Sequence, residues 1–206
     1  MTEHSFFPTS IYIEDRPDFL PEVRVTIMEY LKDIKAQNLT PEDMLTPVQT
    51  DGFAHEPVLK GFTEFIAQTA WNILDQQGYN MQDSGTYFRE MWCQEVNQYQ
   101  GHDEHVHHYS DQISGIYLVD CPDTGSKLAI HDPRAGKLQI NLPEKDRAVV
   151  TQASPTAVLT AAPGRFYFFN SWTPHSVTRN LGTEATRLVH FNLTVGPAPK
   201  TSAIVV

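Results

Sequence analysis

The 206-residue chain has little of several features that mark other protein classes. Its two cysteines, Cys93 and Cys121, are too few for a disulfide framework, and its first residues lack the basic and apolar regions of a signal peptide. No stretch approaches the ~20 apolar residues that span a bilayer. The 15 basic and 25 acidic residues leave a net charge of -10. These absences predict a reduced, cytoplasmic protein that binds neither membrane nor nucleic acid.

What is present suits one folded unit. About 40% of the residues are hydrophobic, enough for a single core in a chain of this length. Apolar residues at helical spacing predict one helix from about Pro21 to Asn38 and a second from Pro57 to Gly78. The stretch 40–56 is punctuated by proline and glycine and is expected to be a loop. The expected parts of a single domain are a helical part over 1–84, a strand-rich core over 85–196 and a tail over 197–206.

After residue 84 the apolar period changes to two, which is typical of strands. Helices followed by many short strands predict a mainly β, α+β fold, with the helices packed on one side of an antiparallel sandwich or small barrel. The expected strands are 86–97, 113–119, 126–131, 137–141, 147–151, 156–160, 165–170, 175–179 and 186–195.

Four of the nine histidines lie in the segment 101–109. His105 and His107 are two apart in an extended stretch, so alternation sends both rings to one face, where they can reach one metal ion. A solvated polar loop is the alternative interpretation. The segment precedes the apolar run 113–119, however, and this position at the mouth of a sheet favours a ligand site.

His175 opens a later strand, and Arg187 follows twelve residues further on. Arg187 shares its predicted strand face with apolar residues such as Val189 and Phe191. A buried arginine needs an anion, because leaving it unpaired costs several kcal/mol. If the strands of His175 and Arg187 are antiparallel neighbours, a dicarboxylate can bind a metal at one end and Arg187 at the other.

In this order, the motifs resemble the 2-oxoglutarate- and Fe(II)-dependent oxygenases, and most closely those of marine bacteria and cyanophages. The resemblance covers roughly residues 86–196. The matching segments are Trp92-Cys93-Gln94, His102 to His107, Ser114-Gly115-Ile116-Tyr117, His131-Asp132-Pro133-Arg134, Pro163-Gly164, His175, and Arg187 through Asn192.

The resemblance implies a double-stranded β-helix, a jelly-roll or cupin-like fold, with the helices on its major sheet. It also implies Fe(II) held by His105, His107 and His175. Most of the superfamily uses two histidines and one carboxylate, and here His107 stands where the acid is expected. Either three imidazoles bind the metal, or Asp132 or Glu104 supplies a carboxylate. His102, His108 and His131 are weaker candidates.

The resemblance further implies that Arg187 pairs with the distal carboxylate of the co-substrate 2-oxoglutarate. Ser114 and Tyr117 are candidates to donate hydrogen bonds to it, and Trp172 and Phe169 are candidates for the pocket walls. The implied reaction uses dioxygen to hydroxylate a small-molecule or protein substrate while 2-oxoglutarate is decarboxylated to succinate.

Two other functions stay open on the residues alone. A tris-histidine zinc hydrolase or hydratase would use the same three imidazoles but would leave Arg187 without a task. A non-catalytic jelly-roll binding or structural protein would make the histidines incidental. A homodimer formed through the first helix also stays open, beside simple packing of that helix on the sheet.

Overall fold

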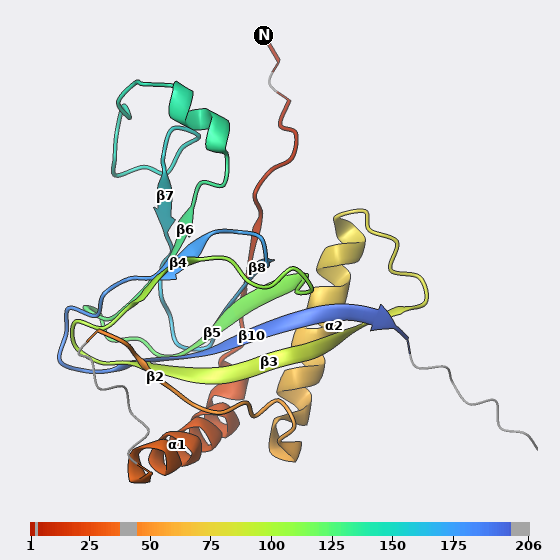
Figure 1. Ribbon diagram of the computed structural model, residues 1–206, viewed down its shortest axis with the longest axis vertical. Helices are drawn as coiled ribbons and strands as arrows, with labels where there is room; N and C mark the ends of the chain where they lie inside the picture. The colour runs from red at the N-terminus through yellow and green to blue at the C-terminus, as the bar shows by residue number, and fades with distance from the viewer. Residues whose placement is uncertain (3, 38–44, 199–206) are drawn as a thin grey trace, which may run out of the picture.

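The computed structural model describes residues 1–2, 4–37 and 45–198. Two antiparallel sheets face each other (Figure 1). In spatial order, the larger contains β1 (Ile11–Asp15), β8 (Arg165–Asn170), β5 (Ile113–Asp120), β10 (Thr186–Pro197), β3 (Ser84–Val96) and β2 (Val48–Gln49). The smaller contains β4 (His102–His105), β9 (His175–Val177), β6 (Leu128–His131) and β7 (Thr156–Val158). From β3 onward the chain passes back and forth between the two sheets, with β6 and β7 as a consecutive pair in the smaller one, which is the topology of the expected double-stranded β-helix.

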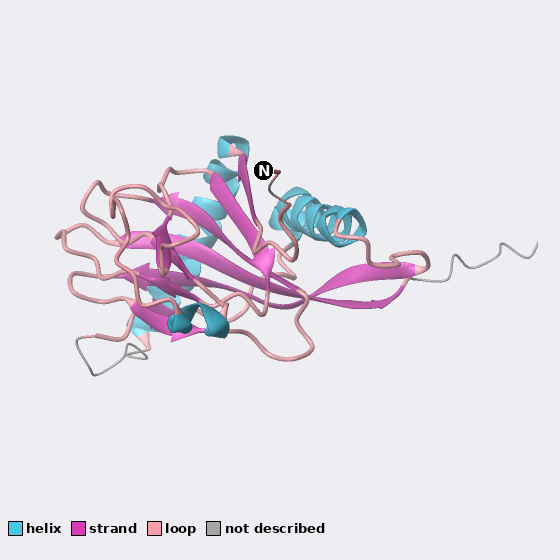
Figure 2. Cartoon of the chain, turned by 90° about the horizontal axis from the view of Figure 1, so that it is seen from above, coloured by secondary structure: helices cyan, strands magenta, loops and turns pink. Residues whose placement is uncertain are grey.

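Two helices cover the outer face of the larger sheet, as the sequence predicts (Figures 1 and 2). They are α1 (Leu20–Ala36) and α2 (Lys60–Gln76), preceded by the 3-10 turns η1 (Pro17–Phe19) and η2 (Pro57–Leu59). Proline in the first turn suits both starts, because its missing N–H has no partner there in any case. Gly78 ends the second helical region at a φ of 91°, a conformation that costs glycine little. The predicted loop 40–56 contains the short strand β2, and its residues 40–44 lie outside the described residues.

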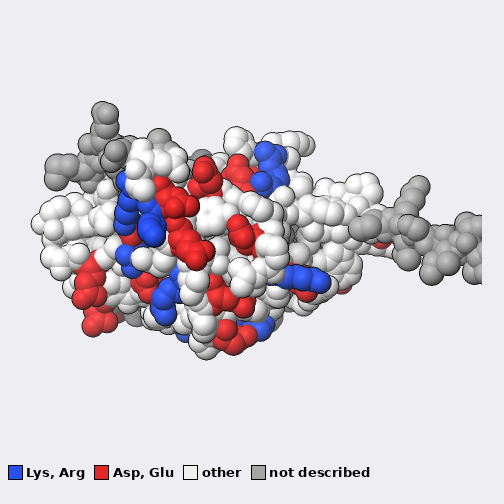
Figure 3. All heavy atoms as spheres, turned by 90° about the horizontal axis from the view of Figure 1, so that it is seen from below, with Lys and Arg blue, Asp and Glu red and all other residues white. Residues whose placement is uncertain are grey.

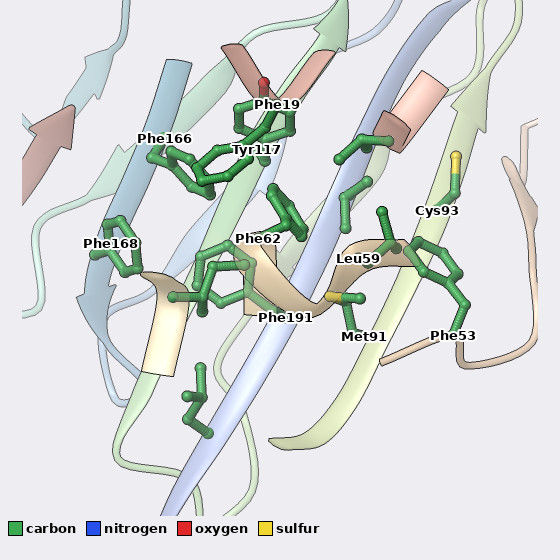
Figure 4. Packing of buried hydrophobic residues seen from close by; sticks show 14 of the residues in the cluster. Phe19, Phe53, Leu59, Phe62, Met91, Cys93, Tyr117, Phe166, Phe168 and Phe191 are labelled. Carbon is green, nitrogen blue, oxygen red and sulfur yellow. The ribbon is translucent and has the colours of Figure 1, made fainter. Parts of the chain in front are cut away.

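The main core lies between these helices and the larger sheet (Figure 4). Phe62 of α2 packs against Tyr117 and Phe166, with ring centroids 5.1 and 5.5 Å away. Each such buried side chain contributes roughly 1.5–3 kcal/mol. Gly115 leaves room in β5 for the ring of Phe191, since a Cβ there would overlap that ring. A second apolar cluster fills part of the space between the two sheets.

Two of the expected strands are wrong. The segment 137–141 begins inside the 3-10 turn η3 (Ala135–Gln139), and 147–151 forms turns and bends. The backbone groups at the start of 137–141 bond locally, as in the hydrogen bond from Lys137 N to Arg134 O, and Leu138 is 89% exposed. Alternating apolar residues form a strand only where a neighbouring strand shares their backbone hydrogen bonds. Among the described residues, neither 137–141 nor 147–151 has such a neighbouring strand.

Cys93 and Cys121 are free thiols, in agreement with the expected lack of a disulfide framework. Within the described ranges, neither helix combines the length and apolarity needed to cross a membrane. Acidic and basic side chains are interspersed on the face seen from below (Figure 3).

Replacing Phe62 by alanine tests the main core. The ring is fully buried, so the Phe62→Ala variant is expected to lose about 3–5 kcal/mol of unfolding free energy through lost burial and the cavity left behind. Denaturant unfolding followed by circular dichroism measures the change. The control is Leu138→Ala at an exposed position, for which we expect less than about 0.5 kcal/mol. Equal losses in the two variants would contradict this assignment of the core.

Candidate metal centre

Three imidazoles come together at the junction of β4 and β9. His105 is the last residue of β4 and pairs in register with His175, the first residue of β9, while His107 lies two residues past β4. One ring nitrogen from each of the three lies within 4.8 Å of the others. The ring centroids are 4.4 Å apart for His105 and His175, and 5.0 Å for His107 and His175. This spacing suits the coordination of a single ion.

Backbone carbonyls orient two of these rings. The Nδ1 of His175 donates to the Thr173 carbonyl at 2.9 Å, and the Nδ1 of His105 donates to the Asp103 carbonyl at 2.8 Å. Each bond leaves the Nε2 of that ring free of a proton and able to bind a metal. The Nε2 of His175 is buried without a hydrogen-bond partner. An unpartnered buried nitrogen is costly, and a metal ion would satisfy it.

Burial also keeps the rings uncharged. It lowers the pKa of His175 to about 3 and the pKa of His107 to about 4, with the neighbouring imidazoles adding to the shift. Metal ions bind the neutral form of imidazole. These two rings can therefore accept an ion at neutral pH without first losing a proton.

A second layer of polar side chains surrounds the cluster. The Nδ2 of Asn192 lies 3.1 Å from the Nδ1 of His107. His190 donates to the Oε1 of Gln94 at 3.2 Å, and Gln94 in turn donates to the Nδ1 of His102 at 3.4 Å. His102 stacks on the ring of His105 at 4.2 Å. The sequence motif from Arg187 to Asn192 contains His190 and Asn192, but spacing alone assigned neither of them a role.

The carboxylates suggested as alternative ligands lie elsewhere. Asp132 is paired with Arg134 and Lys137, at 2.8 and 3.0 Å, which holds the pKa of its carboxyl well below its usual range. Glu104 lies 3.5 Å from the Nδ1 of His131, on a largely exposed side chain. Within the described residues, the group able to share one ion consists of imidazoles alone. His131 and the exposed His108 are not part of it.

Arg187 lies on the opposite face of the larger sheet, so the expectation that it faces the imidazoles is wrong. Its Nε donates to Glu95 at 2.8 Å and its Nη1 to Asp120 at 3.0 Å. Two basic residues of α1 share these acids, with Lys35 2.6 Å from Glu95 and Arg24 3.0 Å from Asp120. The arginine does have the anionic partner that its apolar row demands, but neighbouring strands provide it.

Sheet topology explains this placement. The strand of His175, β9, belongs to the smaller sheet, and its neighbours are β4 and β6. The strand of Arg187, β10, belongs to the larger sheet between β5 and β3. The two strands are therefore not the antiparallel neighbours that the bridging dicarboxylate required.

The other predicted contacts divide between the two faces. Tyr117 points toward the helices, where its hydroxyl donates to the Arg16 carbonyl at 2.9 Å, so it does not face the imidazoles. Ser114 is buried with its Oγ 2.8 Å from that of Ser171, and it pairs in register with Asn192. The ring of Phe169 lies 4.6 Å from that of His175. Trp172 is half exposed and lines a cavity together with His107.

Comparison with known proteins identifies the family. The family model described as "Putative 2OG-Fe(II) oxygenase" matches residues 90–192, which is half of the chain and spans all three imidazoles. The chain belongs to the 2OG-Fe(II) oxygenases. It is therefore an enzyme of the family that uses Fe(II) and 2-oxoglutarate, as the motifs imply. No protein of curated function matches the sequence of this oxygenase.

Solved structures show the same fold. The oxygenase is similar to AviO1 from Streptomyces viridochromogenes, with a TM-score of 0.64, 12% identity and 93% of each chain covered. It is also similar to a Pseudomonas putida prolyl-4-hydroxylase, with a TM-score of 0.59, 10% identity and coverage of 90% of this chain and 93% of that one. It is also similar to the viral collagen prolyl hydroxylase of Paramecium Bursaria Chlorella virus-1, with a TM-score of 0.56, 12% identity and coverage of 97% of this chain and 98% of that one. At sequence identities this low, the similarity shows a shared fold and nothing about the substrate.

Replacing Arg187 distinguishes its two interpretations. The Arg187→Ala variant of the oxygenase leaves the buried Glu95 with Lys35 alone, so we expect a loss of about 2 kcal/mol in unfolding free energy. Affinity for 2-oxoglutarate, measured calorimetrically on the metal-loaded protein, should change less than about threefold, because the guanidinium lies on the other face of the sheet.

The matched control is Arg147→Ala, which removes an exposed guanidinium and should leave stability unchanged. Our placement of Arg187 is refuted by a variant of unchanged stability that binds 2-oxoglutarate much more weakly.

Proposed function

We propose that this oxygenase hydroxylates an organic substrate while 2-oxoglutarate is decarboxylated to succinate, with Fe(II) held by His105, His107 and His175. The observation that carries the proposal is the convergence of three imidazoles around the unpartnered Nε2 of His175. A solvated loop of histidines would not bury such an atom. Imidazole is a suitable ligand for Fe(II), so the donor set fits the metal of the family.

The set differs from the usual facial triad, because His107 occupies the place of the carboxylate. A neutral third ligand leaves the bound ion with more positive charge than two imidazoles and one carboxylate would. Three protein ligands still leave coordination positions open for 2-oxoglutarate and dioxygen. When bound, Fe(II) and 2-oxoglutarate would activate dioxygen, which is the oxidant: one oxygen atom goes to the substrate and the other to succinate, while the keto acid loses carbon dioxide.

The chain itself orients the imidazole rings and excludes water from them. The Thr173 and Asp103 carbonyls hold the rings of His175 and His105 in one orientation. The ring of Phe169 packs beside His175 and excludes water from that side. Of the three residues predicted to bind 2-oxoglutarate, Ser114 alone lies on the same sheet face as Asn192, so it stays a candidate donor to the co-substrate. Tyr117 and Arg187 lie on the other face of the sheet and have no role in the proposed site.

Loss of one imidazole should weaken metal binding strongly. We expect the chelator-treated protein to bind one Fe(II) per chain, and His175→Ala to lower that affinity by at least ~100-fold, since even residues that only orient metal ligands contribute 10–100-fold. Anaerobic calorimetry measures the affinity, and succinate release measures turnover. His55→Ala, which removes an exposed imidazole away from the cluster, is the matched control and should bind as the wild type does.

The same preparation separates the oxygenase from a tris-histidine zinc enzyme. Adding 2-oxoglutarate to the anaerobic Fe(II) protein should produce a visible absorption band, because the keto acid chelates the ion. A protein that binds Zn(II) tightly, shows no such band and forms no succinate would defeat the proposal.

Asn192 should act on the metal through His107. Its Oδ1 is buried without a partner, and a half-turn of the amide would let this oxygen accept the Nδ1 proton of His107. The Asn192→Ala variant is therefore expected to bind Fe(II) about tenfold more weakly. Ser176→Ala is the matched control, because it removes a hydrogen bond from His131, which is not a proposed ligand. Equal metal affinities of wild type and Asn192→Ala would rule this role out.

A further inference from the structure

A cavity of about 530 Å³ borders the three-histidine cluster, because His107 is one of its wall residues. The rest of its wall comes from the end of α2, the turn before β3, the loop between β4 and β5, the turn between β8 and β9, and the far part of β10. We call it the aromatic pocket, because Tyr79, Tyr109 and Trp172 line it. Its volume falls in the range of small-molecule sites, about 300–1,000 Å³.

The three aromatic side chains are unusually exposed. Tyr79 is 57%, Trp172 50% and Tyr109 fully exposed, although each comes from a different segment of the chain. Single exposed aromatics are common on protein surfaces, but several gathered around one cavity indicate a binding site. Their flat faces suit stacking against another ring.

The lining of the pocket carries negative rather than positive charge. Its described lining contains one carboxylate, Asp111, and neither lysine nor arginine. The Asp111 side chain is only 1% exposed, and its Oδ1 has no hydrogen-bond partner. Arg89 lies 3.2 Å from this oxygen in an ion pair, but outside hydrogen-bond geometry. Burial raises the pKa of the Asp111 carboxyl, an effect that a donor on a ligand would offset.

Each of the three amide side chains at this wall has at least one hydrogen bond, and the Oδ1 of Asn80 accepts from the Gln82 N–H at 3.1 Å. Asn170 exchanges two hydrogen bonds of 2.9 Å with Gln77. Gln112 donates to the Ser110 carbonyl at 3.1 Å. The Oδ1 of Asp111 thus has an ion-pair partner in Arg89 but no hydrogen bond, and a carboxylate oxygen can accept one from a ligand.

Building on the proposed function, we propose that the aromatic pocket is the substrate site and takes a compact small molecule with a flat apolar ring and a neutral or cationic hydrogen-bond donor. The ring stacks among Tyr79, Tyr109 and Trp172, and the donor binds Asp111. An anionic group is disfavoured, because the described lining contains a carboxylate and neither lysine nor arginine. The wall at His107 then brings the substrate to the metal centre.

Three probes of one shape test this specificity: 2-phenylethylamine, 2-phenylethanol and 3-phenylpropionate. Their dissociation constants are measured by ligand-observed NMR on the metal-free protein near neutral pH. We expect the amine and the alcohol to bind at least about tenfold more tightly than the acid, since an anion beside Asp111 lacks a partner. Binding of the acid as tight as that of the alcohol overturns the proposal.

Two variants locate the determinants. Asp111→Asn should bring the affinity for the acid to within about threefold of that for the alcohol, while the exposed control Asp123→Asn keeps the wild-type preference. Trp172→Ala, at a half-exposed position that should not affect folding, is expected to weaken all three probes about three- to tenfold. Its control, the exposed Leu181→Ala, should change nothing. Wild-type binding by Trp172→Ala overturns the proposal even where Asp111→Asn fails to fold.

A last measurement ties the pocket to the metal. With Mn(II) bound, the NMR signals of the bound amine should broaden strongly, because His107 belongs both to the pocket and to the metal cluster. Because the affinities come from metal-free protein, an unexpected probe ranking counts against the aromatic pocket alone. Loss of metal binding counts against the proposed function alone. Tight probe binding without broadening in a Mn(II)-loaded protein refutes the assignment of the pocket to the substrate.

Discussion

Neighbouring side chains of β10 point to opposite faces of the larger sheet, and this alternation separates the core from the chemistry. Val189 and Phe191 pack against the helices, whereas His190 and Asn192 point into the space between the sheets. β10 pairs with β5 on one side and β3 on the other, so its register is set twice. A slip of one residue would exchange the two rows and bury Asn192 among phenylalanines. The surroundings of the metal centre therefore depend on how well the helices pack on the far side of the sheet.

The metal centre is assembled from parts of differing rigidity. His105 and His175 are neighbours in register across β4 and β9, and backbone carbonyls orient both rings. His107 lies just beyond β4, where its backbone N–H donates to the Ser171 carbonyl and its ring meets Asn192. Two of the proposed ligands are thus held by strand pairing, and the third by a loop that also lines the aromatic pocket. This arrangement connects the proposed substrate pocket directly to a proposed metal ligand.

Much of the fold could be predicted from the residues. The apolar stripes give both helices nearly to the residue, and the period of two locates most strands of the core. The pattern failed at 137–141 and 147–151, because alternation cannot tell whether a partner strand will be present. It also left out β1, which adds to the edge of the larger sheet beside β8 through a contact distant in sequence.

The sequence by itself determined which atoms can bind a metal, because imidazole nitrogens are ligands whatever surrounds them, and the motif order identified the family. It also determined that Arg187 must have an anionic partner, since an apolar row leaves a guanidinium no other means of stabilisation. Only the tertiary structure decided which anion that is. Glu95 and Asp120 are 92 and 67 residues away along the chain, and strand pairing on the helix-covered face brings them to Arg187. The face on which a side chain lies depends on how strands are divided between two sheets, and no local pattern records that division.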